Sequence, residues 1–190
     1  MKKLLFVVAL VGFAFTSCNQ KVKDEAFLEE ETVQAKEVME RAPDETIFKP
    51  EVLGAEFVGL DNVPINFEQI LGQVKGNVVL IDIWANWCPD CIKAFPEAKK
   101  IQEEFPAVSY IYLSLDKDQK TWKDGIAKHK LDGEHFFLND PKGMKSEFGQ
   151  GLVLNWIPRY IIVDRNSKIA LFDATEKSFD QIREMLQKLQ

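Results

Sequence analysis

The sequence predicts one α/β domain, built as a central sheet with helices over both of its faces. The stretch 78–84 is apolar at all but one position, which is typical of an inner strand covered on both sides. Strand-like runs alternate with helical patterns after it. With 190 residues and 46% hydrophobic content, the chain is long enough for one sizeable core and too short for two.

Apolar periodicity and turn residues place the other elements in chain order. Two short strands around a turn are predicted over 57–67, followed by one or two helical turns over 68–74. After the inner strand come a helix over 92–105, a strand over 108–115, a helix over 122–129, a strand over 136–138 and a short helix over 144–148. A strand pair over 159–164 and 168–173 then precedes a closing helix with apolar residues between 179 and 189.

Cys88 and Cys91 stand where the inner strand gives way to the first long helix. Cysteines at this spacing on a helix start put the first sulfur beside free backbone N–H groups, at the positive end of the helix dipole. That position lowers the pKa of a thiol and creates a nucleophile. Pro89 suits the first helical turn, where its missing N–H costs nothing. We therefore expect Cys88 to be the accessible attacking sulfur and Cys91 to be the resolving one.

Two runs of sequence carry a family resemblance. The run Val78–Cys91 resembles the active-site strand and helix start of thioredoxin-like proteins, and is most similar to the extracytoplasmic thiol-disulfide oxidoreductases of the TlpA/ResA type. The run Trp156–Asp164 resembles the family's cis-proline and the strand after it. The resemblance extends from about Leu53 to the C-terminus. It implies a thioredoxin fold, with a central mixed sheet flanked by helices, an N-terminal hairpin and a helix-plus-strand insertion between the two runs.

Asp82 is the one charged residue inside the inner strand. Burial disfavours a charged carboxylate, so we expect its pKa to be raised by desolvation. By position it resembles the buried aspartate of thioredoxin, which assists in deprotonating the resolving cysteine through water. Thioredoxin has a lysine on the next strand, where this chain offers tyrosine, as at Tyr112. The alternative is a carboxylate that is satisfied by backbone or by Tyr112 and takes no part in catalysis.

Pro158 matches the cis-proline of the family, which faces the first cysteine and presents backbone to an extended substrate. The resemblance implies that Trp87, Trp156, Ile157 and Pro158 form an apolar collar around that cysteine. Trp156 could instead be a core residue. Arg159 stands where the family commonly has threonine, so we include it among the candidate substrate-binding residues.

The resemblance implies thiol-disulfide exchange with extracytoplasmic proteins, through a mixed disulfide on Cys88 that Cys91 resolves. No metal or organic cofactor is expected beyond the Cys88–Cys91 pair itself. Expected partners are protein or peptide thiols and disulfides, together with a protein that restores the redox state of the pair. The net charge of −6 argues against nucleic acid as a partner.

Three other functions stay open on the sequence alone. A zinc site would need two ligands besides the cysteines, and His129 and His135 lie far downstream without a matching spacing. A thiol peroxidase of the peroxiredoxin type would place Thr or Ser where this chain has Ala85. A binding or metal-handling module of the same fold would use the thiols as ligands.

Asp90, inside the motif, bears on the direction of the reaction. A negative charge close to Cys88 opposes ionisation of its thiol, which destabilises the reduced form of the pair. We therefore expect the protein to work on the reducing or isomerising side rather than as a primary oxidant.

The N-terminus has the pattern of an export signal. Met1-Lys2-Lys3 is positive, residues 4–15 are apolar, and Thr16-Ser17-Cys18 closes the segment with small residues. This resembles a bacterial lipoprotein signal, with Cys18 as the lipidated residue. We expect a signal peptide over 1–17, a charged and partly helical linker over 18–50, and the thioredoxin-like domain over 51–190. The mature protein would then be a membrane-anchored lipoprotein that faces the periplasm or cell envelope.

Overall fold

The computed structural model describes residues 46–190. The expected signal peptide, the lipidation site Cys18 and most of the expected linker lie outside the described residues. Within residues 46–190, no helix is both long enough and apolar enough to cross a membrane.

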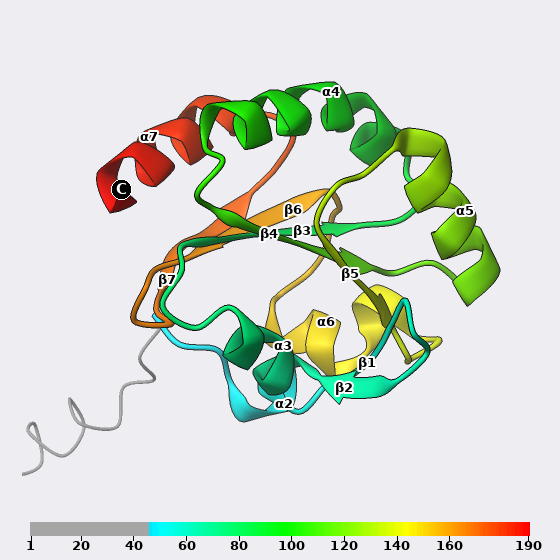
Figure 1. The fold of residues 1–190 in the computed structure, drawn as a ribbon. Coiled ribbons are helices and arrows are strands. Elements are labelled where there is room, and N and C mark those ends of the chain that lie inside the picture. Colours follow the sequence, from blue (N-terminus) through cyan, green and yellow to red (C-terminus); the bar gives the residue numbers. More distant parts are fainter. Residues whose placement is uncertain (1–45) are drawn as a thin grey trace, which may run out of the picture. The chain divides into compact units, whose positions relative to one another are not determined.

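One seven-stranded mixed sheet organises this part of the chain, with strand order β2-β1-β5-β4-β3-β6-β7 (Figure 1). The strands are β1 (Glu56–Gly59), β2 (Pro64–Asn66), β3 (Val79–Trp84), β4 (Ser109–Ser114), β5 (Glu134–Leu138), β6 (Arg159–Val163) and β7 (Ile169–Ala174). β3 pairs with β4, and β4 with β5, in parallel, while every other pairing is antiparallel. The predicted mixed sheet and N-terminal hairpin are confirmed.

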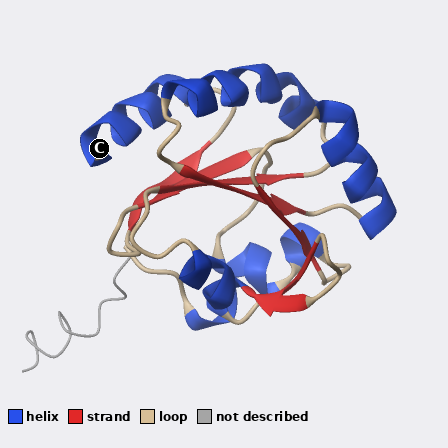
Figure 2. Ribbon diagram, in the orientation of Figure 1, coloured by secondary structure: helices blue, strands red, loops and turns tan. Residues whose placement is uncertain are grey.

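Helices cover both faces of this sheet, as Figures 1 and 2 show. The long helices α4 and α7 lie over one face, and the short helices α2, α3 and α6 lie over the other. The helices are α2 (Pro50–Leu53), α3 (Phe67–Gln73), α4 (Pro89–Glu104), α5 (Gln119–His129), α6 (Glu147–Gly151) and α7 (Phe179–Leu189), with a 3-10 turn at Gly143–Lys145. The fold class is therefore the predicted one.

The inner strand β3 has buried side chains on both of its faces, so helices must pack on both faces of the sheet. All six of its residues are buried. Because side chains alternate along a strand, Ile81 and Ile83 face the core shared with α2, α3 and α6, whereas Leu80 faces the core shared with α4 and α7. An apolar run of this kind is stable only inside a sheet layered on both faces.

The N-terminal side of the domain begins before the predicted hairpin. Phe48 is 5% exposed, and its ring packs edge-on against that of Phe67 at 5.0 Å. Pro50 then starts α2, a four-residue helix that the sequence pattern did not predict. Residues 46–53 thus cover part of one face of the sheet, and α4 covers the other face.

Candidate active site

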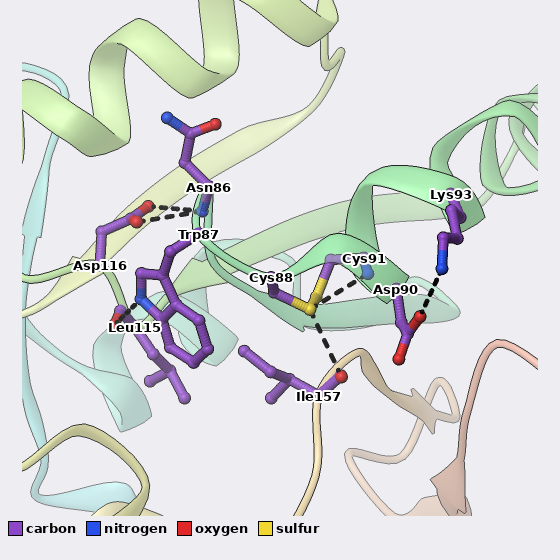
Figure 3. The surroundings of a disulfide bond; sticks show 9 residues. All are labelled: Asn86, Trp87, Cys88, Asp90, Cys91, Lys93, Leu115, Asp116 and Ile157. Atoms are coloured by element: carbon purple, nitrogen blue, oxygen red, sulfur yellow. Dashed lines mark hydrogen bonds and ion pairs between the residues drawn. A yellow bond between two sulfur atoms is a disulfide. The ribbon is translucent and has the colours of Figure 1, made fainter.

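Cys88 and Cys91 lie at the junction of β3 and α4, as predicted (Figure 3). Cys88 is the N-cap of α4, Pro89 is its first residue, and Cys91 lies in its first turn. The two sulfur atoms form a disulfide, with the Cα atoms 5.3 Å apart. Cys91 is fully buried, and Cys88 keeps only 3% of its surface exposed. The sulfur that is less deeply buried is thus Cys88, although little of it reaches the surface in this oxidised form.

Two backbone groups contact the Cys88 sulfur. The backbone N–H of Cys91 donates to Cys88 Sγ at 3.1 Å, and the carbonyl oxygen of Ile157 lies 3.4 Å from the same sulfur. An N–H group at a helix start stabilises a thiolate, through the hydrogen bond and the helix dipole together. A carbonyl oxygen can accept from a thiol but repels a thiolate. The N–H of Cys91 therefore favours Cys88 as a thiolate, whereas the carbonyl of Ile157 favours it as a thiol.

The Ile157–Pro158 peptide bond is cis, as the resemblance implied. Ile157 is buried against the disulfide, while Trp87 and Trp156 leave 48% and 52% of their surfaces exposed. The interpretation of Trp156 as a core residue is therefore wrong. Trp87 precedes Cys88 and Trp156 precedes Ile157 in the chain, so these two exposed residues are candidates for apolar contact with a polypeptide.

Arg159, predicted among the substrate-binding residues, is buried instead. It starts β6 and is 6% exposed, and its Nη2 donates to Asn155 Oδ1 at 3.4 Å. Desolvation by burial lowers the pKa of its guanidinium. The side chain is thus not on the exposed surface with Trp87 and Trp156, and its contact with a substrate stays a prediction.

Asp90 faces solvent in the first turn of α4 and forms an ion pair with Lys93 at 3.2 Å (Figure 3). The Lys93 side chain is 76% exposed, so this pair is screened by water and weak. The negative charge of Asp90 near the Cys88 end of the helix is therefore reduced but not cancelled.

Asp82 is buried in β3 on the face that α4 covers. Neither of its carboxylate oxygens has a hydrogen-bond partner among the described residues. Desolvation raises its pKa from 3.8 to about 8, as expected for an unpaired buried carboxylate. The alternative of a satisfied carboxylate is wrong, because Tyr112 Oη donates to Gln102 Oε1 at 3.5 Å instead.

Helix α4, which carries the second cysteine, covers the face of β3 that holds Asp82. Trp84, two residues after Asp82 on the same face of β3, packs edge-on against Phe95 of α4 with ring centroids 5.5 Å apart. Cys91 is one helical turn before Phe95. The buried carboxyl and the helix that holds the resolving sulfur thus lie on the same side of the sheet.

Asp116, just after β4, belongs to the site although the sequence pattern does not single it out. Its carboxylate accepts the backbone N–H of Asn86 at 3.0 and 3.1 Å (Figure 3). It also accepts the hydroxyl of Ser114 at 2.9 Å. In the same loop, the Trp87 indole N–H donates to the carbonyl of Leu115 at 3.4 Å. Asp116 therefore positions the loop that leads from β3 to Cys88. The available signal was a carboxylate just after β4, at the sheet edge where β3 also ends.

The described residues contain no group of three or more His, Cys, Asp or Glu side chains that could hold a metal ion. His135 is buried, stacks on Tyr112 at 4.9 Å, and contacts the carbonyl of Leu131 through Nε2 at 3.2 Å. His129 packs against the ring of Phe95 at 5.2 Å. Desolvation lowers the pKa of both imidazoles.

The fold and the site together define a class of protein: a mixed α/β sheet with a two-cysteine disulfide at a helix start, next to a cis-proline. Residues 76–169 match the profile of a family described as thioredoxin-like. The chain belongs to this thioredoxin-like family.

Relatives of known sequence or structure agree with this assignment. The chain is 26% identical to the thioredoxin-like protein YneN of Bacillus subtilis over 117 residues, which are 58% of this chain and 66% of that protein. It is 26% identical to a Bacteroides vulgatus protein named as a thiol-disulfide oxidoreductase, with a TM-score of 0.61 over 74% of this chain and 89% of the other. A Chlorobium tepidum protein named as thiol:disulfide interchange protein DsbE shares the fold, with 20% identity, a TM-score of 0.60, and coverage of 77% and 97%.

Proposed function

We propose that this protein is a thiol-disulfide oxidoreductase that exchanges disulfides with other proteins outside the cytoplasm. The observation that carries the proposal is the Cys88 sulfur between the N–H of Cys91 and the carbonyl before Pro158. Thiol-disulfide exchange by a cysteine pair needs a stabilised thiolate on the first cysteine, a second thiol within reach of it, and a surface that binds the substrate chain. Family membership and the names of the solved relatives support the same activity.

The proposed reaction has two steps in the direction of substrate reduction. The Cys88 thiolate attacks a substrate disulfide, forms a mixed disulfide, and releases one substrate thiolate, which takes up a proton. Cys91 then loses its proton to Asp82 and attacks the Cys88 sulfur, so that the second substrate sulfur leaves and the Cys88–Cys91 disulfide forms. The exposed rings of Trp87 and Trp156 would hold the substrate segment, and the carbonyl of Ile157 would order its backbone.

Trapping of the intermediate tests this division of roles. Because only Cys91 can resolve the mixed disulfide, Cys91→Ala should accumulate mixed disulfides with a reducible substrate such as insulin, whereas Cys88→Ala should not. Non-reducing electrophoresis and mass spectrometry measure the adducts. Equal trapping by both variants, or by neither, would contradict the assignment of the two sulfurs.

We also propose the direction of disulfide exchange and the absence of a cofactor requirement. Asp90 supports a role on the reducing or isomerising side, since its charge opposes ionisation of Cys88. A partner dithiol protein would return the pair to the reduced state. The chemistry requires no metal or organic group, so the purified protein should reduce insulin disulfides with dithiothreitol equally well after treatment with a chelator.

The N-terminal sequence supports a membrane-anchored lipoprotein, with Cys18 as the modified residue. If this is correct, the mature protein should fractionate with membranes, and its N-terminal peptide should carry the mass of a lipid. Cys18→Ala should abolish both properties, because no thiol is left at that position to modify. An unchanged fractionation and an unchanged N-terminal mass in the variant would count against the anchor.

A further inference from the structure

The buried carboxyl of Asp82 needs a route by which protons reach solvent. Each reaction cycle delivers the proton of Cys91 to Asp82, and that proton must leave before the next cycle. Asp82 is 4% exposed, and both carboxylate oxygens are shielded from solvent. Above Asp82 lies α4, and its neighbours on the same face of β3 are Leu80 and Trp84, which carry no group that relays protons from solvent. We therefore consider the residues beside Asp82 on the neighbouring strands as the exit.

Tyr160 of β6 lies directly beside Asp82 in the sheet. The two residues are opposite each other in the antiparallel β3–β6 register, so both side chains emerge on the face that α4 and α7 cover. Tyr160 is 1% exposed, and its hydroxyl has no hydrogen-bond partner among the described residues. Burial, then the nearby charge of Asp82, raises the pKa of this hydroxyl well above its usual value. A neutral hydroxyl beside a carboxyl can accept one proton while it donates another.

Glu176 continues the line from Tyr160 to the surface. Tyr160 pairs with Ala174 of β7, and its ring packs against Phe179 of α7 at 5.4 Å, so it contacts both ends of the turn that holds Glu176. Glu176 Oε2 is shielded from solvent and has no partner in the described part of the chain, whereas 21% of the side chain is exposed. Its Oε1 lies 4.0 Å from Nζ of the exposed Lys177. Glu176 therefore has one oxygen toward the interior and contact with solvent.

From this alignment of unpaired oxygens we propose that Tyr160 and Glu176 form a proton path between Asp82 and solvent at the β7–α7 turn. The inference rests on the proposed function, since it serves the resolving step. Internal water would bridge the gaps between the three side chains, because buried polar groups without protein partners are the sites that hold ordered water.

The step balances as follows. Cys91–SH gives its proton to the Asp82 carboxylate, and the Cys91 sulfur uses its electron pair to form the bond to Cys88. The pair of the broken mixed disulfide leaves on the substrate sulfur. Asp82–COOH then passes its proton towards Tyr160, whose hydroxyl gives up its own proton towards the Glu176 carboxylate. Glu176 releases a proton to bulk water, and Asp82 is again a carboxylate.

The opposite side of Asp82 offers no equal route. Tyr112 of β4 is also in register with Asp82, but its hydroxyl is already engaged with Gln102. Tyr110, two residues earlier on β4, directs its hydroxyl to the carbonyls of Ile101 and Phe105. The charged groups between α4 and α7 are paired with one another, namely Glu97, Glu104 and Arg183. His135 of β5 lies beyond Tyr112 in the same row, stacks on the Tyr112 ring and contacts the Leu131 carbonyl through Nε2, so the engaged Tyr112 separates it from Asp82. Tyr160 is the residue in register with Asp82 whose hydroxyl is unpaired among the described residues, and we therefore assign the path to Tyr160 and Glu176.

The test separates the two sulfurs in one experiment. A full-length Cys18→Ser protein keeps Cys88 and Cys91 as its only cysteines. Reduced protein reacts with 5,5′-dithiobis(2-nitrobenzoate) in a stopped-flow instrument, and thionitrobenzoate is released twice. The first release reports attack by Cys88, and the second reports attack by Cys91 on the mixed disulfide. Rates are measured from pH 5 to pH 10, and the free energy of unfolding is measured for each variant.

We expect Tyr160→Phe and Glu176→Gln to slow the second release about tenfold or more near neutral pH, while the first release is unchanged. The rate of the second release should then keep rising with pH beyond the ionisation of Asp82, because hydroxide removes the proton directly. High concentrations of imidazole buffer should accelerate Glu176→Gln and leave the parent protein unaffected. Glu176→Asp should recover part of the rate.

Two matched variants serve as controls. Tyr112→Phe removes the other hydroxyl in register with Asp82, and Glu103→Gln removes an exposed carboxylate on α4. Both should keep the parent rate and pH profile. A buried hydroxyl without a partner contributes little to stability, so Tyr160→Phe should fold normally; Glu176→Gln, near the surface, provides a second variant.

The outcomes are distinct. If neither release occurs in the parent protein, the proposed function itself fails, and the proton path fails with it. If the parent reacts and Asp82→Asn slows the second release while Tyr160→Phe and Glu176→Gln match the parent at every pH, the path is wrong and the function stands. If Asp82→Asn leaves the second release unchanged, the path has no proton source and is likewise wrong.

Discussion

Single side chains set the chemistry of the two sulfurs, and Asp90 is the one that most directly opposes the helix dipole. The N–H of Cys91 favours the Cys88 thiolate at 3.1 Å, whereas the Asp90 carboxylate in the same turn disfavours it. At ~6 Å and an effective dielectric of ~40, Coulomb's law gives ~1.4 kcal/mol. The ion pair with Lys93 removes part of this, because the positive charge lies 3.2 Å from Asp90.

We expect Asp90→His to lower the pKa of the Cys88 thiol and to make the reduction potential of the pair less negative, where loss of the Asp90 charge alone corresponds to up to ~30 mV. The reason is that a stabilised thiolate favours the reduced form. Equilibration with glutathione buffers, followed by quantification of the free thiols, measures the potential. Asp90→Asn, which removes the charge without adding a positive one, should fall between the two. A potential that stays the same or becomes more negative in Asp90→His would remove the basis for a reducing role.

At the level of elements, the sequence predicts best what local patterning controls. The run at β3 is apolar enough to require an inner strand, and the cysteine spacing with Pro89 sets the start of α4. Helix α5 begins at Gln119, three residues before its predicted start, because the Asp118 carboxylate caps the N–H of Thr121 at 2.8 Å. The four residues of α2 are too few for any helical period to be visible in the sequence.

Contacts between distant elements are what the sequence could not provide. Asp116 reaches Asn86 across 30 positions, and Tyr160 comes to lie beside Asp82 only through the register of β3 and β6. The exposed fraction of a side chain also depends on how distant parts of the chain pack around it. Trp156 and Arg159, three residues apart, end at 52% and 6% exposed, although neither residue type dictates that outcome. The two cysteines, Asp82 and Pro158 could therefore be predicted from the sequence, whereas the roles of Asp116 and Tyr160 emerged only from the fold.

At the scale of the whole molecule, the central strand β3 affects both the redox site and the stability of the domain. It leads to Cys88, and it also buries the carboxyl group of Asp82, whose protonation changes the free energy of unfolding. Both faces of the sheet are covered by helices (Figure 1), so the carboxyl of Asp82 is shielded from bulk solvent. Its pKa is raised to about 8 in the folded protein, compared with 3.8 in an exposed chain. The folded state therefore binds one more proton than the unfolded state between these two pH values. Asp82 contributes fully to stability below about pH 4, and this contribution is lost as the pH rises towards 8.

We expect the free energy of unfolding of the native protein to fall with rising pH relative to that of Asp82→Asn, which has no carboxyl at this position to titrate. The difference should change by roughly 4 kcal/mol between pH 4 and pH 7 in favour of the variant, and should level off above pH 8. Urea unfolding at a series of pH values measures it. The raised pKa of Asp116 and the lowered pKa values of His129 and His135 are common to both proteins and cancel in the difference. As a control, Asp124→Asn removes an exposed carboxylate of α5 that pairs with Lys120, and its curve should run parallel to that of the native protein. Parallel curves for Asp82→Asn as well would mean that burial does not raise the pKa of Asp82, and that its carboxylate is too weak a base to take the proton of Cys91.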